Sequence, residues 1–298
     1  MKILIAGSTG LIGTALVTAL KQSGHEVVRL VRSDTCLIER CLQWEPSDGK
    51  IDTERLNGFD AFISLGGANL SGRRWTARFK QEIRDSRVIP TQLLAETITR
   101  LRQKPKLWLS ASAIGYYGVS PEGMVDESSP AGDDFLADVC AEWESATDPA
   151  RKAGVRVITL RTGAVLTIEG GALAKMLPLF KFGLGGKLAS GKQIMSWISL
   201  EDMVGAIKHL LKSDTISGPV NLVSPHPVSN EKFTKALAHQ LNRPAIIPVP
   251  AFAMKILLGE MATYLALSSL AVSPQKLLDS GFQFKTPKLP DSLRELVP

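Results

Sequence analysis

Three glycines near the start of the chain have the spacing of a phosphate-binding turn. Gly7, Gly10 and Gly13 follow a short apolar run and precede a helical pattern. The first glycine permits a tight turn, the second lets a pyrophosphate approach the backbone, and the third lets the helix pack closely on the sheet. Free N–H groups at the positive helix end then hold the phosphate. The predicted dinucleotide-binding residues are Gly7, Ser8, Thr9, Gly10, Leu11, Ile12 and Gly13.

The end of the second predicted strand indicates which dinucleotide is bound. NAD-binding proteins place an acid there for the ribose 2′-hydroxyl, whereas a 2′-phosphate requires a cation. Here Val31 holds the acid position and is followed by Arg32 and Ser33. A guanidinium can bind a phosphate through two parallel hydrogen bonds, and the serine adds a donor. We therefore expect NADP(H). NAD(H) is the alternative, if Arg32 is only a solvated surface residue.

Short apolar runs alternate with helical patterns through the first two thirds of the chain. The predicted strands are residues 2–6, 26–31, 61–65, 107–110 and 155–160, and the predicted helices are 11–23, 75–101 and 135–153. Continuous apolar runs are typical of parallel strands that are buried on both faces. The alternation predicts right-handed βαβ units and an α/β fold with a doubly wound parallel sheet, the Rossmann fold.

The pattern changes after about residue 166. Glycines punctuate a loop-rich insertion, which is followed by a helix over 199–212, a strand over 219–223 and a mainly helical, proline-interrupted tail. We therefore expect an NAD(P)-binding domain of residues 1–168 with about 193–224. A smaller, mainly helical substrate subdomain would comprise about 169–192 with 225–298 and close over the sheet.

Composition narrows the class of protein. The 35 Lys and Arg against 29 Asp and Glu give a net charge of +6, which suits a small anionic substrate. No nucleic-acid module and no apolar run long enough to cross a membrane is visible. Three scattered cysteines predict reduced structural thiols, a reducing compartment and no metal site. We expect a cytoplasmic protein, with monomer and homodimer both open.

The Gly-x-x-Gly-x-x-Gly spacing resembles the extended short-chain dehydrogenases/reductases, the family of nucleotide-sugar epimerases and dehydratases. The resemblance implies a turn beside the cofactor ribose, formed by Leu65, Gly66, Gly67 and Ala68. It also implies that Ser112 matches the catalytic serine, with Ser110 as the second candidate. Ser110 is also expected to lie beside the cofactor. Tyr116 or Tyr117 would then supply a phenol.

The resemblance fails at one essential motif. In the family a lysine lowers the pKa of the tyrosine in Tyr-x-x-x-Lys, so that the tyrosine moves a proton while nicotinamide moves a hydride. Depending on the register, the corresponding pair here is Phe135 with Val139 or Leu136 with Cys140. This departure, together with residues 170–186 and 248–261, resembles the atypical "epimerase family" proteins with a characteristic C-terminal domain. That resemblance covers essentially the whole chain.

Basic residues form a second group between residues 73 and 87. Lys80, Arg84 and Arg87 share one predicted helix face with acids among them, which is typical of a solvated, ion-paired surface. Arg73 and Arg74 lie nearer the expected active-site mouth, where they could bind an anionic substrate group.

Two functions remain open from the sequence. The first is an NADP(H)-dependent oxidoreductase or epimerase-like enzyme, with Ser112 and Tyr116 as catalytic residues and a small substrate, for which nucleotide-linked compounds are candidates. The second, favoured by the missing tyrosine–lysine pair, is a non-catalytic NADP(H)-binding protein with a redox-sensing or regulatory role.

Overall fold

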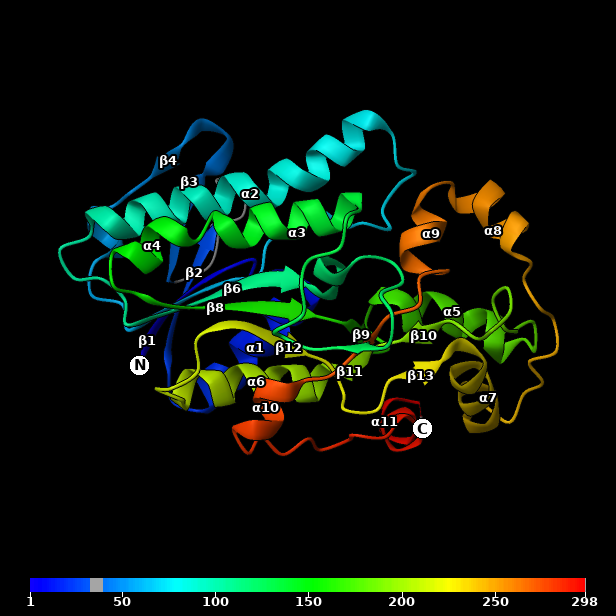
Figure 1. Ribbon diagram of the computed structural model, residues 1–298. Helices are drawn as coiled ribbons and strands as arrows, with labels where there is room; N and C mark the ends of the chain where they lie inside the picture. The colour runs from blue at the N-terminus through cyan, green and yellow to red at the C-terminus, as the bar shows by residue number, and fades with distance from the viewer. Residues whose placement is uncertain (33–39, 298) are drawn as a thin grey trace.

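The computed structural model describes residues 1–32 and 40–297 (Figure 1). The main strands are β1 (Lys2–Ala6), β2 (Glu26–Val31), β3 (Cys41–Glu45), β4 (Lys50–Ile51), β5 (Ala61–Ser64), β6 (Leu107–Ala113), β8 (Arg156–Thr162) and β12 (Gly218–Leu222). They form one sheet in the order β12-β8-β6-β5-β1-β2-β3-β4. All neighbours pair in parallel except β3 and β4, which are antiparallel. The predicted doubly wound parallel sheet is confirmed.

Helices cover both faces of this sheet. One layer contains α1 (Leu11–Gln22) and α6 (Leu200–Lys212), and the other contains α2 (Ala77–Arg100), α3 (Phe135–Ser145) and α4 (Asp148–Lys152), as Figure 1 shows. Alternate residues of β1 enter different cores. Ile3 and Ile5 pack in the core that includes α1 and α6, whereas Leu4 and Ala6 pack in the core that includes α2 and α4. This two-sided burial explains the continuous apolar run of β1.

One predicted helix is divided in the structure. Residues 135–153 form α3 and α4 rather than a single helix, with Pro149 in the first turn of α4. Proline has no backbone N–H to donate to the carbonyl four residues earlier, so it suits a helix start and interrupts a helix interior. Asp134 sets the start of α3, because its side chain accepts hydrogen bonds from the N–H groups of Leu136 and Ala137.

The segment predicted as a loop-rich insertion contains a helix, α5 (Gly171–Lys181), so that prediction is wrong. Gly170 and Gly171 lie at the start of this helix and Gly183 follows its end, positions at which glycines do not interrupt a helix. The remaining helices are α7 (Asn230–Gln240), α8 (Ala251–Leu258), α9 (Met261–Leu265), α10 (Gln275–Asp279) and α11 (Leu289–Leu296). Short elements are β7 (Met124–Val125), β9 (Ala164–Leu166), β10 (Ile194–Met195), β11 (Trp197–Ser199), β13 (Val228–Ser229), β14 (Ala271–Val272) and the 3-10 turns η2 (Pro46–Asp48), η3 (Glu54–Leu56) and η4 (Ile114–Tyr117).

A separate apolar core joins α5, α7 and α11 around the buried Trp197. The tail is mainly helical, as predicted, but it is not packed in one place. Leu277 of α10 lies in the core of the large sheet, beside α6. The proposed division into two domains stays a prediction. Among the described residues, no helix is both long enough and apolar enough to cross a bilayer.

The prediction of three reduced cysteines is wrong. Cys41 is disulfide-bonded, whereas Cys140 is a free and buried thiol. An odd, sparse set of cysteines argues against a framework of several disulfides, but it carries no information about a single bond. The cysteines therefore no longer support a reducing compartment.

Candidate functional site: a cleft at the carboxyl edge of the sheet

A cleft of about 1120 Å³ opens where β1, β2 and β5 end. Its walls are the turn after β1 (Gly7, Ser8, Thr9), the end of β2 (Val31, Arg32), the turn after β5 (Ser64, Gly66, Gly67, Ala68) and one side of α2. From β1 the chain continues to β2 and β3 on one side, while β5 and β6 lie on the other. Ligands of open α/β sheets bind at such a reversal of strand order.

Gly7 and Gly13 give the first turn a shape that no side chain would permit. Gly7 has a φ of +77°, and a Cβ atom there would lie 2.8 Å from the backbone nitrogen of Gly66. A Cβ atom at Gly13 would overlap the carbonyl oxygen of Gly7. The two turns therefore touch at Gly7 and Gly66, and α1 begins directly beneath the first turn. This is the close backbone approach that the glycine spacing predicts.

Ser8 carries a buried hydroxyl that lacks a partner. The residue is 2% exposed and lines the cleft, and its Oγ makes no hydrogen bond within the described part of the chain. Gly10, the residue that caps α1, contributes no side chain to the first N–H groups of the helix. A buried hydroxyl without a partner is costly, and unpaired N–H groups at a helix start attract anions. The turn therefore fits a phosphate group.

The structure brings together only part of the predicted cofactor set. Gly7, Ser8, Thr9, Arg32, Gly66, Gly67 and Ala68 line the cleft, while Ser33 lies outside the described residues. Gly10, Leu11, Ile12 and Gly13 form the start of α1 behind that wall, and Leu65 packs against the core. Ser110 is fully buried, with its Oγ 3.4 Å from the Oγ of Ser64. It lies behind the wall as well.

A further wall of the cleft was not predicted. Trp44, Glu45, Pro46 and Ser47 close the side next to β2. They belong to β3 and η2, which the sequence pattern does not predict. Leu42 and Trp44 are buried while Gln43 between them is exposed. This alternation was the signal for a strand, but it is too short to stand out.

Ser112, the predicted catalytic serine, is part of a buried ionic network. It is 4% exposed, and its hydroxyl donates to Oε1 of Glu144 at 2.7 Å. Arg161 donates to both oxygens of the same carboxylate, at 2.8 and 2.9 Å. Burial alone would lower the pKa of the Arg161 guanidinium, but its hydrogen bonds and charge attraction to Glu144 outweigh burial and raise it. The carboxylate thus holds Ser112 and Arg161 together.

The two tyrosines after β6 contact Arg161 in different ways. Tyr117 is buried, accepts a hydrogen bond from Arg161 at 3.0 Å and donates one to Asn221 at 2.8 Å. Burial raises the pKa of the Tyr117 phenol. Tyr116 is only partly buried, and the guanidinium carbon of Arg161 lies 3.4 Å from the centre of its ring. Of the two tyrosines, Tyr116 is therefore the more exposed, and neither is among the residues that line the cleft of about 1120 Å³.

The helix that should carry the tyrosine–lysine pair presents Leu136 and Cys140 to this region. A Cβ atom on Gly115 would lie 3.4 Å from Cβ of Leu136 and 3.8 Å from Sγ of Cys140. Phe135 and Val139 pack in an apolar cluster around Trp75, which Leu136 also contacts. Burial raises the pKa of the Cys140 thiol to about 12. The thiol stays protonated near neutral pH, so neither position supplies acid–base chemistry.

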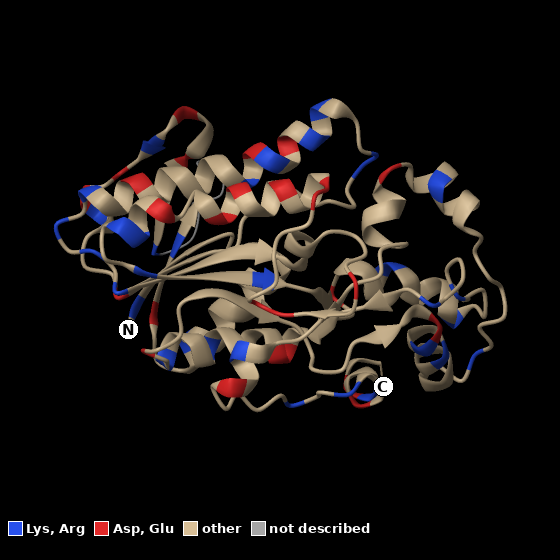
Figure 2. Ribbon diagram, viewed as in Figure 1, with Lys and Arg blue, Asp and Glu red and all other residues tan. Residues whose placement is uncertain are grey.

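Three of the basic residues between 73 and 87 form ion pairs at the surface, which is the kind of face that was predicted. Arg73 pairs with Glu82, Lys80 with Glu260 and Arg84 with Glu142. Figure 2 shows acidic and basic residues interspersed along α2, next to α3, which carries acidic residues. Arg74 donates to the carbonyl of Ile256 at 3.3 Å, which ties the start of α2 to α8. Arg73 and Arg74 therefore both have partners within the protein, Glu82 on α2 and the backbone of α8.

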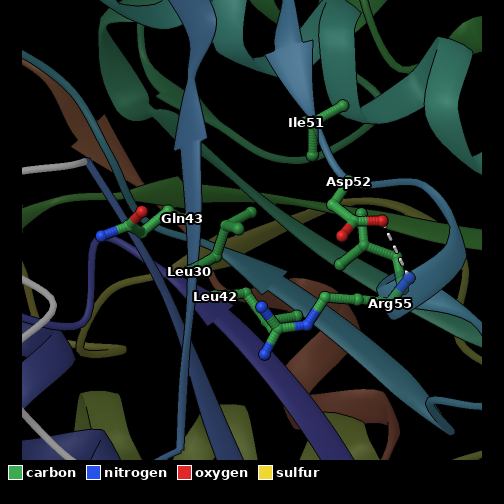
Figure 3. Close-up of a pocket in the computed structure, with 7 residues that line it drawn as sticks. Leu30, Leu42, Gln43, Ile51, Asp52 and Arg55 are labelled. Atoms are coloured by element: carbon green, nitrogen blue, oxygen red, sulfur yellow. Dashed lines mark hydrogen bonds between the residues drawn. The ribbon is translucent and has the colours of Figure 1, made fainter.

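A smaller cavity, of about 200 Å³, lies at the β2–β3 side of the sheet and is lined by Leu30, Leu42, Gln43, Ile51, Asp52, Arg55 and Leu56 (Figure 3). Asp52 accepts a hydrogen bond from the backbone N–H of Arg55 there, at 3.3 Å. None of the predicted site residues lines this cavity. Within residues 1–32 and 40–297, no cluster of three or more His, Cys, Asp or Glu is arranged to hold a metal ion.

Comparisons with known proteins agree with this geometry. Residues 3–223 match the NAD dependent epimerase/dehydratase family, and residues 249–296 match a domain of unknown function, DUF1731. The Epimerase family protein ML0860 of Mycobacterium leprae is 45% identical over 282 residues, which cover 95% of this chain and 91% of the relative. The human Epimerase family protein SDR39U1 is 36% identical over 307 residues, with both chains fully covered.

Solved structures of epimerase family proteins and epimerases have the same fold. The crystal structure of human epimerase family protein SDR39U1 (isoform 2) with NADPH has a TM-score of 0.90 at 34% identity, covering 100% of this chain and 99% of the other. The UDP-glucose 4-epimerase of Thermotoga maritima, crystallised with UDP-glucose, has a TM-score of 0.78 at 17% identity, covering 100% and 97%. At that lower identity the likeness concerns the fold alone.

Proposed function

Because the chain belongs to the NAD dependent epimerase/dehydratase family, we propose that it binds NADP(H) in the cleft of about 1120 Å³. The observation that carries this proposal is the first turn, where Ser8 has a buried hydroxyl without a partner and Gly7 leaves no room for a side chain. The human relative crystallised with NADPH supports the choice of cofactor.

The residues of the cleft divide between the parts of the dinucleotide. Ser8 and the N–H groups at the start of α1 would hold the pyrophosphate. Arg32, an exposed residue at the end of β2, would hold the 2′-phosphate through its guanidinium. Gly66, where a Cβ atom would have nothing within 4 Å, would leave space for a ribose at the second turn.

For the reaction we propose an oxidoreductase or epimerase-like activity on a small substrate, with nucleotide-linked compounds as candidates. When bound, the nicotinamide supplies a hydride or accepts one. Tyr116 would exchange the accompanying proton, since it is only partly buried and its ring lies against the permanent charge of Arg161. Ser112, the other predicted catalytic residue, donates its hydroxyl to Glu144, so we propose that it positions Arg161 through that carboxylate.

A second function, a non-catalytic NADP(H)-binding protein that reports redox state, is favoured by one specific observation. Leu136 and Cys140, one of the two candidate registers for the missing tyrosine and lysine, lie beside Gly115 after β6, and the Cys140 thiol is protonated. On this alternative, the cofactor would bind without being turned over.

Turnover distinguishes the two functions. With NADPH and a panel of sugar nucleotides, quinones and aldehydes, we expect loss of the reduced-nicotinamide absorbance, slowed about 10²- to 10⁴-fold by Tyr116→Phe without a change in NADPH affinity. Tyr264→Phe is the matched control, because that ring stacks on Trp75 outside the ionic network. Tight binding without turnover across the panel would support the sensor and refute the enzyme.

The choice of cofactor depends on Arg32. We expect Arg32→Ala to weaken NADPH binding about 10- to 100-fold, the value of charge-assisted hydrogen bonds to one phosphate, and to leave NADH binding unchanged. Calorimetric titration with each cofactor measures the ratio of the NADPH affinity to the NADH affinity. Arg102→Ala is the control, because Arg102 is exposed and pairs with Glu54 away from the cleft. An unchanged NADPH/NADH ratio in Arg32→Ala would show that the 2′-phosphate lies elsewhere.

A further inference from the structure

Arg87 differs from the other cations of its helix. Lys80 and Arg84 each pair with a glutamate at the surface, whereas no Asp or Glu among the described residues lies within ion-pair distance of Arg87. The prediction of a solvated, ion-paired face therefore fails at this residue. Arg87 is partly buried instead, and burial lowers the pKa of its guanidinium because the charged form loses water.

The protein holds this guanidinium in one orientation. Its Nη1 donates to the carbonyl of Ile83 at 2.8 Å and its Nη2 to the carbonyl of Ala68 at 3.0 Å. The ring of Trp143 lies on another side, with its centre 5.3 Å from Cζ. These partners are neutral dipoles and an aromatic face, so the positive charge of Arg87 is not compensated by a carboxylate. Burying an uncompensated charge is unfavourable unless a ligand supplies the opposite charge.

Arg87 also lies where such a ligand would bind. It lines the cleft together with Gly67, and a Cβ atom on Gly67 would lie 3.2 Å from Cζ of Arg87. The neighbouring Gly66 touches Gly7 of the first turn. The guanidinium is thus packed on the second of two turns whose backbones are in contact, and the first of them has the unpartnered hydroxyl of Ser8.

We propose that Arg87 is a second phosphate-binding cation of the cleft and that it binds the pyrophosphate of the dinucleotide. This rests on the proposed function, that NADP(H) occupies the cleft. Arg32 follows β2 and Arg87 packs on the turn after β5, on opposite sides of β1. With neighbouring strands about 4.8 Å apart, the ends of β2 and β5 are separated by about 10 Å. The Arg87 guanidinium is held by the carbonyl of Ala68 at the turn that touches the glycine turn, so we assign it the pyrophosphate and Arg32 the 2′-phosphate.

The test is a pair of titrations on Arg87→Gln. Because NADPH and NADH share the pyrophosphate, we expect both to bind about 10- to 100-fold more weakly, with their ratio unchanged. The affinity of the variant should also fall less steeply with added NaCl, since one charge contact is gone. Arg84→Gln is the matched control, one turn earlier on α2 and paired with Glu142, and should leave both affinities unchanged.

The opposing outcomes are distinct. Unchanged affinities, or a loss confined to NADPH, overturn the pyrophosphate assignment. A weaker affinity with the wild-type salt dependence means that Arg87 only shapes the turn at Ala68, which also overturns it. Arg87→Lys keeps the positive charge but loses the paired N–H donors of the guanidinium, so its affinities should lie between those of the wild type and of Arg87→Gln. Thermal denaturation shows whether each variant is folded. If the wild type binds neither dinucleotide, the proposed function fails. Titration with inorganic pyrophosphate then tests the role of Arg87 separately. Equal binding of pyrophosphate by the wild type and by Arg87→Gln overturns that role.

Discussion

Arg161→Met should lower the free energy of unfolding by about 3–5 kcal/mol, because it leaves the Glu144 carboxylate buried without its cation. The side chains of Arg161 and Glu144 are 4% and 12% exposed. Removing the guanidinium also takes a hydrogen-bond donor from Tyr117, whose hydroxyl connects the network to Asn221 on β12. Urea denaturation followed by tryptophan fluorescence measures the loss.

The matched control is the exposed pair of Arg102 and Glu54. Arg102 contacts both carboxylate oxygens at 3.1 Å, but the two side chains are 80% and 72% exposed. Arg102→Met should therefore cost at most about 1 kcal/mol. The double variant Arg161→Met with Glu144→Leu should recover part of the stability, since no charge stays buried. Equal losses at the buried and exposed pairs would contradict the assignment of this network as a buried ionic core.

Gly7→Ala should reduce NADPH affinity by at least about 100-fold, equivalent to two charge-assisted hydrogen bonds, and should also destabilise the fold. The new Cβ atom would meet the backbone at Leu65 and Gly66, each at 2.8 Å, and would push the two turns of the cleft apart. Calorimetric titration and thermal denaturation measure the two effects separately.

Gly24→Ala separates the contribution of backbone conformation from that of the clash. Gly24 has a φ of +78°, almost the same as Gly7, but a Cβ atom there would have nothing within 4 Å. Alanine in the left-handed region costs about 1–2 kcal/mol, so Gly24→Ala should lose stability by that amount and keep its cofactor affinity. If the two variants bind NADPH equally well, contact between the turns is not what shapes the cleft.

The family assignment and the proposed chemistry stand on different evidence. The glycine turn, the parallel sheet and the similarity to the human protein crystallised with NADPH agree on a dinucleotide site. The absence of acid–base groups at Leu136 and Cys140 shifts the proposed proton transfer to Tyr116, and makes turnover the measurement that decides between enzyme and sensor.

Local sequence was sufficient for the elements that build the first half of the cleft. The strands at residues 2–6 and 26–31 were predicted with the bounds that the structure has, because continuous apolar runs between turns depend only on neighbouring residues. The Gly7–Gly13 spacing predicted close packing of turn and helix for the same reason. Where the local pattern was weak or ambiguous, as at the short β3, at α5 between its glycines and at the break before Pro149, the prediction failed.

The charged groups of the site were decided only by the tertiary structure. Glu144 and Arg161 are 17 residues apart and lie on different elements, so no periodic pattern shows that they pair in the interior. Arg84 and Arg87 share a helix face in the sequence, yet one lies against Glu142 and the other beneath the Gly67 turn. Helix periodicity predicts which residues share a face. Whether those side chains are buried or form ion pairs depends on which other segments pack against that face. For this reason Gly7, Gly10 and Gly13 were sufficient to predict a dinucleotide site, but the role of Arg87 required the fold.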